Sequence, residues 1–517
     1  MRAARAGGRR PLRTARARGR RPSREAACRL NDRVPVLASP LVSAVLPDRP
    51  PFVIRARLVS PLAVGGALDL RDGRLEVDAE GRIAAVGPWP AVGDGAAVVG
   101  GSVVSAAGST VPVIDLRPFA VLPGLIDLHA HLPQLPNAGL GFGLPLLEWL
   151  ERYVFPLERE FDADAADRLA PAAFRAFAAA GTTTAMLYGA LWEPSTDRAF
   201  AAAEAHGIRA VIGKVMMDRL SYDEDPRTQA ATLELSLRQS AELCQRWHRR
   251  DGGRLLYAFT PRFAVSCSAD MLRESAALAD AAGAHWQTHV SEDAGEIAEV
   301  ERLFPEARDY LDVYDRAGAL GPRTVLAHAI HLSDREVGRL AESGARVAHC
   351  PESNLFLSSG TMPLARYLEA GIPVGLGSDV AGGPDPSIFR AMRVGAYVQN
   401  ARRVAGLDTA PILGPLDWLR LGTLDGARAL GLGESIGSLE VGKEADLIAV
   451  DVAATAPLGE GAGGPVGSSG PELDDPADLL SRLIFRSHPA MVRGAWVRGR
   501  RLAGPPAAPD SPVQPVP

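Results

Sequence analysis

The middle of the chain, from about residue 119 to residue 427, repeats one pattern of apolar and polar positions. Each repeat has an apolar run of four to eight residues, a polar residue where the run ends, and a segment rich in Ala, Leu, Arg and Glu with helical spacing. The segments between runs have room for the crossover that connects parallel strands, which needs about a dozen residues. The pattern therefore predicts an α/β fold, a (β/α)8 TIM barrel, with its active site at the carboxyl ends of the strands. The eight predicted strands are residues 122–129, 182–187, 210–216, 255–260, 285–289, 324–327, 345–349 and 372–376.

The flanks of this region have a different pattern, in which short apolar runs alternate with polar residues and turns. Such runs occur at residues 52–59, 83–86, 447–450 and 490–498. Runs of this length favour strands. We therefore expect a small β-sandwich domain built from residues 51–118 and 428–505, beside a catalytic barrel at residues 119–427. The Gly-, Ser- and Pro-rich stretch 454–471 is expected to be a surface loop.

Charge is distributed unevenly along the chain. Residues 1–33 carry 12 Arg, no Lys and two acidic residues, a net charge of +10. The remainder carries 44 basic and 59 acidic residues, or −15, within a total of −5. We expect residues 1–50 to be a disordered Arg-rich extension and residues 506–517 to be a disordered tail. The acidic remainder argues against a nucleic-acid partner.

Hydropathy and cysteine usage limit the compartment. No stretch approaches about 18 uninterrupted apolar residues, so no membrane-spanning helix and no membrane partner are expected. The four cysteines are scattered and form no CxxC pair, which argues against a disulfide framework and against a zinc ribbon. A cytoplasmic location is the expectation that follows.

Polar side chains that bind metals gather where the predicted barrel strands end. The first strand ends in a His-Ala-His sequence, and residues two apart on a strand point to the same face, so His129 and His131 both face the barrel mouth. His289 ends the fifth strand, His328 follows the sixth and Asp379 follows the eighth. Because only ten histidines are spread over 517 residues, this order predicts a metal centre.

This arrangement resembles the amidohydrolase superfamily over roughly residues 50–505, and several longer strings are similar to the guanine deaminase family within it. The strings lie at residues 123–134, 146–150, 181–185, 213–218, 260–264 and 287–292. Three positions depart from the family's usual pattern: Ser378 stands where Thr is usual, Ala329 where Gly is usual, and Glu352 lies inside the string 349–354. An extra carboxylate at residue 352 would alter the charge of the pocket.

The resemblance implies one metal ion per subunit, Zn²⁺, held by four residues: His129, His131, His289 and Asp379. Neutral imidazoles and one carboxylate leave a net positive site, which lowers the pKa of a bound water toward about 7. The same ligand set accepts Fe²⁺. Lys214 lies in the third predicted strand, where some members of the superfamily use a carboxylated Lys to bridge two metals. Because the family resembled here uses one metal, we expect Lys214 to form a structural ion pair.

The resemblance also implies the catalytic residues. Glu292 is expected to take a proton from the attacking water and deliver it to the ring nitrogen next to the attacked carbon, which a carboxyl with a raised pKa can do. His328 is expected to hydrogen-bond that water or the tetrahedral intermediate. Asp379 can also accept the proton of the water while it binds the metal.

The resemblance implies that three residues recognise the substrate: Gln134, Arg262 and Phe263. Arg262 would donate charge-assisted hydrogen bonds to the carbonyl side of a flat ring, Gln134 would donate and accept on the ring edge, and Phe263 would pack on the ring. The substrate-binding set is completed by residues that also serve the metal or the proton: His131, His289, Glu292 and Asp379.

Four further residues near the predicted site have no catalytic role in this scheme. Trp149 and Trp192 could cover the site, although core packing is their expected function. His331 and His349 lie near strand ends and are given no role.

The resemblance implies a hydrolase that acts on C–N bonds in cyclic amidines. It would deaminate guanine, a small-molecule purine, to xanthine and ammonia in purine catabolism, and it would do so as a homodimer. Two alternatives remain open. One is a related ring, such as 8-oxoguanine, a pterin or an aminotriazine, since Gln134 and Arg262 favour guanine but Glu352 leaves room for another ring. The other is a metal-free scaffold of the same fold, against which the complete ligand set argues.

Overall fold

The computed structural model describes residues 46–89, 102–104, 110–221, 229–456 and 475–504. The predicted disordered tail, the first 45 residues of the predicted extension and most of the predicted loop at 454–471 lie outside these residues. The last part of the predicted extension is described, and Pro47 O accepts a hydrogen bond from Trp496 Nε1 at 2.7 Å. This part of the chain therefore lies against the β domain.

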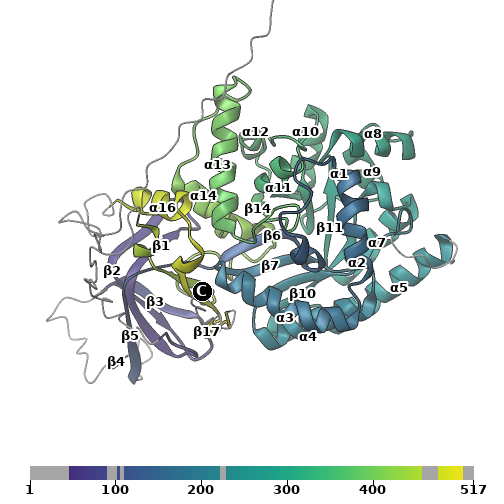
Figure 1. Ribbon diagram of the computed structural model, residues 1–517. Helices are drawn as coiled ribbons and strands as arrows, with labels where there is room; N and C mark the ends of the chain where they lie inside the picture. The colour runs from purple at the N-terminus through teal and green to yellow at the C-terminus, as the bar shows by residue number, and fades with distance from the viewer. Residues whose placement is uncertain (1–45, 90–101, 105–109, 222–228, 457–474, 505–517) are drawn as a thin grey trace, which may run out of the picture. The chain divides into compact units, whose positions relative to one another are not determined.

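Parallel strands in the middle of the chain form a barrel with helices around it (Figure 1). The barrel strands are β6 (Leu125–His131), β7 (Thr182–Tyr188), β8 (Arg209–Gly213), β9 (Val215–Met216), β10 (Leu255–Pro261), β11 (His285–Val290), β12 (Thr324–His328), β13 (Arg346–His349) and β14 (Val374–Leu376). They are hydrogen-bonded in the order β6, β7, β8, β10, β11, β12, β13, β14, with β9 beside β10, and β14 contacts β6. The predicted (β/α)8 TIM barrel is confirmed.

The barrel strands are buried on both faces, which explains why each reads as a continuous apolar run in the sequence. Most predicted strands agree with the structure to within one or two residues at each end, but two differ by more. The strand predicted at 122–129 begins at Leu125, because Leu122 and Pro123 belong to the second sheet. The strand predicted at 210–216 is divided into β8 and β9, with Lys214 between them.

Helices connect the barrel strands, as a parallel sheet requires. The longer helices between barrel strands are α3 (Ala163–Ala179), α4 (Glu193–His206), α5 (Gln229–Trp247), α7 (Ala269–Ala282), α8 (Ala294–Leu303), α9 (Tyr310–Arg316) and α10 (Asp334–Ser343). Three further helices follow the last barrel strand: α13 (Ile388–Val404), α14 (Pro415–Leu421) and α16 (Pro476–Phe485). The shorter ones near the barrel mouth are η1 (Leu132–Asn137), α1 (Leu146–Trp149), η2 (Leu150–Val154), α2 (Phe155–Arg159), η3 (Ala264–Ser266) and α11 (Pro351–Phe356). The remaining short helices are α6 (Arg250–Gly253), α12 (Leu364–Glu369), α15 (Leu424–Ala429), η4 (Ala453–Thr455) and η6 (Pro489–Met491).

Local sequence signals set the ends of these helices, and α10 shows how. Ser333 caps its first turn, because the Ser333 side chain accepts from Glu336 N while the Glu336 side chain accepts from Ser333 N. Gly344 ends the helix with a φ of 71°, in the left-handed region that favours glycine.

The second sheet is built from both flanks of the barrel, as predicted. It contains β1 (Phe52–Pro61), β2 (Ala67–Val77), β3 (Ile83–Pro88), β4 (Ser102–Val104), β5 (Thr110–Pro123), β15 (Leu447–Val450), β16 (Val492–Val497) and β17 (Arg500–Arg501). Its order is β17, β16, β15, β5, β1, β2, β3, with β4 beside β5; β1 and β5 are parallel and the other pairs are antiparallel. Six of its strands, β1, β2, β3, β5, β15 and β16, share one apolar core, to which Phe52, Leu75, Leu447 and Trp496 contribute.

The chain passes from the second sheet into the barrel at Gly124, between β5 and β6. A side chain at this position would come within 2.0 Å of Thr183 Oγ1, so only glycine allows β6 to approach β7 so closely. A buried ion pair also joins the two parts, since Arg209 Nε at the start of β8 donates to Asp446 Oδ2 at 3.0 Å. The change of sheet falls at residue 124; the domain limits given above remain predictions.

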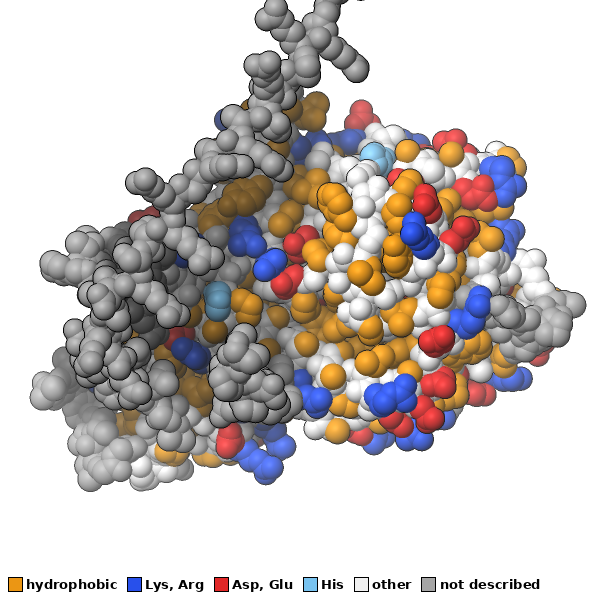
Figure 2. All heavy atoms as spheres, in the orientation of Figure 1, with side chains coloured by type: hydrophobic (Ala, Val, Ile, Leu, Met, Phe, Trp, Pro, Cys, Tyr) orange, Lys and Arg blue, Asp and Glu red, His pale blue; other side chains and the backbone are white. Residues whose placement is uncertain are grey.

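Charged side chains of both signs are scattered over the surface. On the face shown in Figure 2, several Lys and Arg side chains lie beside Asp and Glu side chains. Arg302 and Glu299 form one exposed pair of this kind, at 2.6 Å. Within the described part of the chain, every helix is too short or too polar to cross a membrane.

Candidate active site

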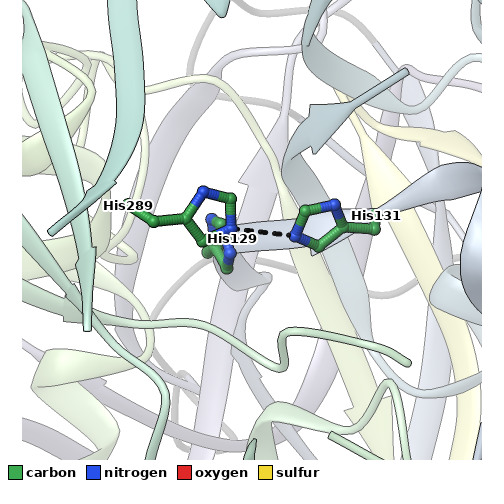
Figure 3. A group of neighbouring side chains, drawn as sticks. All are labelled: His129, His131 and His289. Atoms are coloured by element: carbon green, nitrogen blue, oxygen red, sulfur yellow. Dashed lines mark hydrogen bonds between the residues drawn. The ribbon is translucent and has the colours of Figure 1, made fainter. Parts of the chain in front are cut away.

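Three imidazoles converge at the carboxyl ends of β6 and β11 (Figure 3). His129 and His131 lie two residues apart on β6, so both project into the barrel mouth, where His289 from β11 meets them. Nε2 of His131 lies 3.2 Å from Nε2 of His289, and the ring centroids of His129 and His289 are 4.8 Å apart. All three side chains are buried, so three ring nitrogens meet at one point inside the barrel.

Asp379 brings a carboxylate to the same point. Its Oδ1 lies 3.1 Å from Nε2 of His129 and 3.4 Å from Nε2 of His131. The backbone fixes this position, because Asp379 N donates to His129 O at 2.7 Å and His131 N donates to Val380 O at 2.9 Å. Asp379 has a φ of 50°, a conformation that costs a non-glycine residue about 1–3 kcal/mol and is typical of functional sites. These bonds join the segment after β14 to β6.

The donor atoms of this cluster fit a divalent metal ion. Nδ1 of His289 donates to Arg262 O at 2.6 Å, which leaves the lone pair on Nε2 for a ligand. Burial lowers the pKa of His131 to about 3 and that of His289 well below its usual range. Both imidazoles are therefore neutral at pH 7, the form that binds a metal. Nε2 of His129 lies 3.1 Å from Asp379 Oδ1 but forms no hydrogen bond of good geometry among the described residues, as expected for two atoms that bind the same metal.

Two further buried titratable groups, Glu292 and His328, lie beside the cluster. Glu292 follows a turn at Ser291, where φ is 47°, and this turn directs its side chain into the same cavity as His289. Oε2 of Glu292 lies 3.3 Å from Nε2 of His328. Burial, with the negative charge of Asp379 adding to it, raises the pKa of Glu292 well above its usual range. Glu292 can therefore hold a proton under conditions in which an exposed glutamate would have lost it.

His328 is held in one orientation. Its Nδ1 donates to Asn354 Oδ1 at 2.9 Å, so Nε2 carries the lone pair and faces Glu292 and Asp379. Burial lowers the pKa of His328 to about 4, which keeps the imidazole neutral at pH 7. A neutral imidazole beside a carboxyl with a raised pKa is an arrangement that can accept and return a proton.

Asp127 supports the cluster from behind. Its Oδ1 accepts from His129 N at 3.1 Å and from Ser378 N at 3.0 Å, and its Oδ2 accepts from Ser378 Oγ at 2.5 Å. Because Ser378 precedes Asp379, these bonds connect β6 with the residue that supplies the carboxylate. Only a hydroxyl is needed at residue 378, so serine in place of the family's usual threonine keeps this contact.

One cavity brings together every residue that the sequence predicts for substrate binding. Its polar lining consists of His131, Gln134, Arg262, His289, Glu292, His328 and Asp379. Its apolar lining consists of Leu146, Trp149, Leu150, Phe263 and Leu357. An apolar wall with a few convergent polar groups is typical of a small-molecule site.

Glu158 lies behind two of these residues, and no pattern in the sequence pointed to it. It belongs to α2 and its side chain is fully buried. Its Oε1 accepts from Gln134 Nε2 at 2.7 Å, and its Oε2 accepts from Arg262 Nη1 at 2.6 Å. These three residues come from η1, α2 and the end of β10, so the contact exists only in the folded chain.

Trp192 and Lys214, considered from the sequence as a cover of the site and as a metal-bridging residue, lie away from this cavity. Trp192 Nε1 donates to Arg159 O at 2.9 Å. Lys214 is buried, and its Nζ donates to Ser236 Oγ at 3.1 Å and to Val215 O at 3.3 Å. Neither is among the described residues that line the cavity.

Glu352, His331 and His349 also stand outside the lining. Burial, together with the negative charge of Asp385, raises the pKa of Glu352 to about 7, but its carboxylate is not part of the cavity wall. His331 Nε2 donates to Ser359 O at 2.8 Å. His349 is fully buried at the end of β13, with both ring nitrogens unpaired among the described residues. The extra carboxylate at residue 352 therefore leaves the lining of the pocket unchanged.

Four contributors to the site were missed by sequence reasoning: Asp127, Glu158, Glu296 and Asn354. Asp127 and Asn354 lie inside strings already singled out, so their polarity within buried segments was a usable signal. Glu296 accepts from Glu292 N at 2.8 Å and caps α8, a contact that its spacing from Asp293 signals locally. Glu158 has no such signal, because both of its partners are distant in sequence.

The chain matches the amidohydrolase family model over residues 120–502. It is 41% identical over 392 residues to a probable guanine deaminase of Deinococcus radiodurans, which covers 75% of this chain and 85% of that protein. The structure is similar to that of the E. coli guanine deaminase, with a TM-score of 0.76 and 30% identity over 87% of this chain and 99% of that one.

A second solved structure adds a ligand to the comparison. The guanine deaminase of C. acetobutylicum, determined with guanine bound in its active site, is 27% identical, with a TM-score of 0.76 over 87% of this chain and 99% of that one. A family model that spans most of the chain and a relative matched over most of its length give the same assignment. The chain belongs to the amidohydrolase family and, within that family, to the guanine deaminases.

Proposed function

We propose that this chain hydrolyses guanine to xanthine and ammonia. The observation that carries the proposal is the single cavity in which the His and Asp cluster, the Glu292–His328 pair and the Gln134–Arg262 pair meet. These groups supply a metal site, a proton carrier and a polar pair that can orient a flat ring. Membership of the guanine deaminases and the bound guanine in the C. acetobutylicum structure support the choice of substrate.

In the proposed complex, Arg262 and Gln134 bind the edge of the ring that carries the carbonyl. Arg262 donates to the carbonyl oxygen and Gln134 bonds the neighbouring ring nitrogen. Phe263 and Trp149 pack against the ring and exclude water. This orientation directs the amine-bearing carbon toward His131, His289 and Asp379.

His129, His131, His289 and Asp379 are proposed to hold the metal, which we propose is Zn²⁺. When bound, the metal lowers the pKa of a water molecule toward about 7 and so supplies a nucleophile near neutral pH. Glu292 takes a proton from the attacking water and gives it to the ring nitrogen beside the attacked carbon. His328 accepts a hydrogen bond from the water, and Asp379 can share its proton. The remaining proton of the water passes to the amine as the new C–O bond becomes a carbonyl, so the C–N bond breaks and ammonia leaves.

The test is a substrate panel on the purified full chain, with metal content measured on the same sample. Ammonia and xanthine released from guanine are the expected products. Ammonia from 8-oxoguanine, a pterin or an aminotriazine, without turnover of guanine, would favour the related-ring alternative. A protein without bound transition metal that releases no ammonia after Zn²⁺ is added would be the metal-free scaffold.

The metal, the assembly and the compartment complete the proposal. The same ligands accept Fe²⁺, so the ligand set does not distinguish it from Zn²⁺. Elemental analysis of protein purified without added metal identifies which of the two is bound. A homodimer is proposed from the family, and exposed apolar residues on and after α13, such as Tyr397, Val404 and Ile412, support a contact there. Light scattering on the full chain tests whether the protein is a dimer.

A cytoplasmic location is also proposed. Three buried cysteines, Cys244, Cys267 and Cys350, form no disulfide, which is typical of proteins in a reducing compartment.

A further inference from the structure

Gln134 and Arg262, the two polar residues proposed to recognise the substrate, both bind the buried carboxylate of Glu158. Gln134 Nε2 and Arg262 Nη1 donate to different oxygens of Glu158, at 2.7 Å and 2.6 Å. Because they bind the two oxygens of one group, the Gln134 amide and the Arg262 guanidinium lie side by side. Both line the cavity, whereas Glu158 lies behind them, fully buried. The Arg262 guanidinium is also held against the Phe155 ring, with its carbon 5.3 Å from the ring centroid.

This contact determines which end of the Gln134 amide is available to a ligand. A carboxylate paired with an arginine accepts hydrogen bonds and donates none. The amide must therefore turn its NH₂ group toward Glu158, since the opposite orientation would set two acceptor oxygens against each other. The Oε1 atom of Gln134 is consequently left as an acceptor, and among the described residues this buried atom has no hydrogen-bond partner. A buried acceptor without a partner, in a residue that lines a cavity, indicates a donor on the ligand.

We propose that Glu158 is a positioning residue that sets the hydrogen-bond polarity of the pocket. Because both side chains donate to Glu158, Arg262 presents its remaining donors to the cavity and Gln134 presents an acceptor beside them. The pair then selects a ring edge on which a carbonyl oxygen lies next to a ring N–H. Guanine has this edge at C6 and N1. The inference deepens the proposed function, on which it rests, by naming the residue that sets substrate specificity.

The same geometry disfavours a ring edge on which the donor and the acceptor are exchanged. A purine with an amine at C6 presents a donor where Arg262 also donates, and its N1 lone pair faces the Gln134 acceptor. A site built to hydrogen-bond one pattern rejects a ligand that lacks it, because buried polar groups are then left unpaired. Hypoxanthine and adenine differ in this edge alone, and neither carries the amine at C2 that the proposed reaction removes. Their dissociation constants therefore report recognition without turnover.

The experiment measures binding of hypoxanthine and adenine to the full, metal-loaded chain by calorimetry. The wild type is expected to bind hypoxanthine about 100-fold or more tightly than adenine. In Glu158→Gln the neutral amide can donate as well as accept, so the Gln134 side chain can turn, and the preference is expected to fall by at least about tenfold. For guanine turnover the same variant should raise KM more than it lowers kcat, since Glu158 is remote from the reacting carbon.

Two further variants separate recognition from folding. Gln134→Leu removes the acceptor and leaves the Glu158–Arg262 pair in place, so it should lose the same preference. Glu444→Gln is the matched control, because it also removes the carboxylate of a buried ion pair, the one between Glu444 and Arg209. Glu444 lies just before β15 and outside the cavity, so this variant should keep the wild-type preference for hypoxanthine over adenine. Metal content and thermal melting confirm that each variant is folded.

The outcomes distinguish this inference from the proposed function. A wild type without preference for hypoxanthine would overturn the inference even if guanine is deaminated. A folded Glu158→Gln that keeps the wild-type ratio would overturn it as well, and if that variant does not fold, an unchanged ratio in Gln134→Leu has the same meaning. Failure to release ammonia from guanine would instead remove the proposed function while the binding ratios still test Glu158.

Discussion

Oε2 of Glu292 lies 3.3 Å from Nε2 of His328, and both side chains are almost completely buried. Burial acts on the two groups in opposite directions: it raises the pKa of Glu292 and lowers that of His328 to about 4. A proton that this pair takes from the water is therefore held by the carboxyl oxygen and not by the imidazole. A carboxyl with a raised pKa can hold this proton until it passes to the ring nitrogen.

Replacement of Glu292 by glutamine should remove most of the turnover. We expect kcat to fall by about 10²–10⁴-fold, because an amide cannot carry the proton, while metal content stays at the wild-type level. Steady-state ammonia release and elemental analysis measure the two quantities. Glu301→Gln, on the exposed face of α8, serves as the control and should retain wild-type kcat. Near wild-type turnover in Glu292→Gln would show that the shuttle is another group.

Replacement of Asp379 by asparagine should release the metal. The carboxylate approaches both His129 and His131, and without its charge we expect the metal affinity to fall by about tenfold or more, with loss of ammonia release. Because a ligand bound only to the native state stabilises it, the melting temperature should fall in parallel, and chelation of the wild type should produce the same shift. Asp385→Asn, at a carboxylate that pairs with Arg390, is the control. An Asp379→Asn variant with full metal content would contradict the ligand assignment.

Replacement of Arg262 by alanine should destabilise the fold as well as weaken guanine binding. It leaves the Glu158 carboxylate buried and without its cation, which costs about 3–5 kcal/mol of unfolding free energy. The double variant Arg262→Met with Glu158→Gln removes both charges, and we expect it to recover at least half of that loss. Urea denaturation of the metal-loaded proteins measures both values. Equal losses in the single and double variants would show that the ion pair contributes little.

His285 should make the protein sensitive to acid. It starts β11, is buried, and burial with the positive charges of His248 and Arg346 lowers its pKa to about 3. In the unfolded chain its pKa is about 6.5. Between these values the unfolded chain binds one more proton, so the stability that this group contributes is complete above pH about 6.5 and is lost as pH falls, at up to about 1.4 kcal/mol per pH unit.

The His285→Gln variant isolates this contribution. The difference in unfolding free energy between wild type and variant should be constant above pH about 7 and should shift in favour of the variant as pH falls below about 6. Urea denaturation at several pH values between 8 and 5, with metal present throughout, measures the difference. A difference that does not change with pH would mean that His285 keeps an ordinary pKa in the folded chain.

Local patterns were enough to predict the barrel and the residues at its strand ends. A strand buried on both faces must be apolar along its length, so β7, β10 and β11 could be recognised within a residue or two of their ends. The bounds of β6 and of the third strand were missed, because the apolar run passes without interruption from β5 into β6 and because Lys214 is buried despite its charge. Hydrophobic patterning cannot distinguish two successive buried strands in different sheets.

Local sequence was sufficient to predict the fold class, the side chains that gather at the strand ends and the turn at which Glu292 lies, since each depends on neighbours a few positions away. The pairing of Glu158 with Gln134 and Arg262, and with it the proposed polarity of the pocket, is visible only in the folded chain. Gln134 and Arg262 lie 24 and 104 residues from Glu158, and a glutamate in a short helix looks solvent-exposed in any local window. Its burial follows from chain closure around the barrel, which brings distant polar groups together so that each satisfies the others.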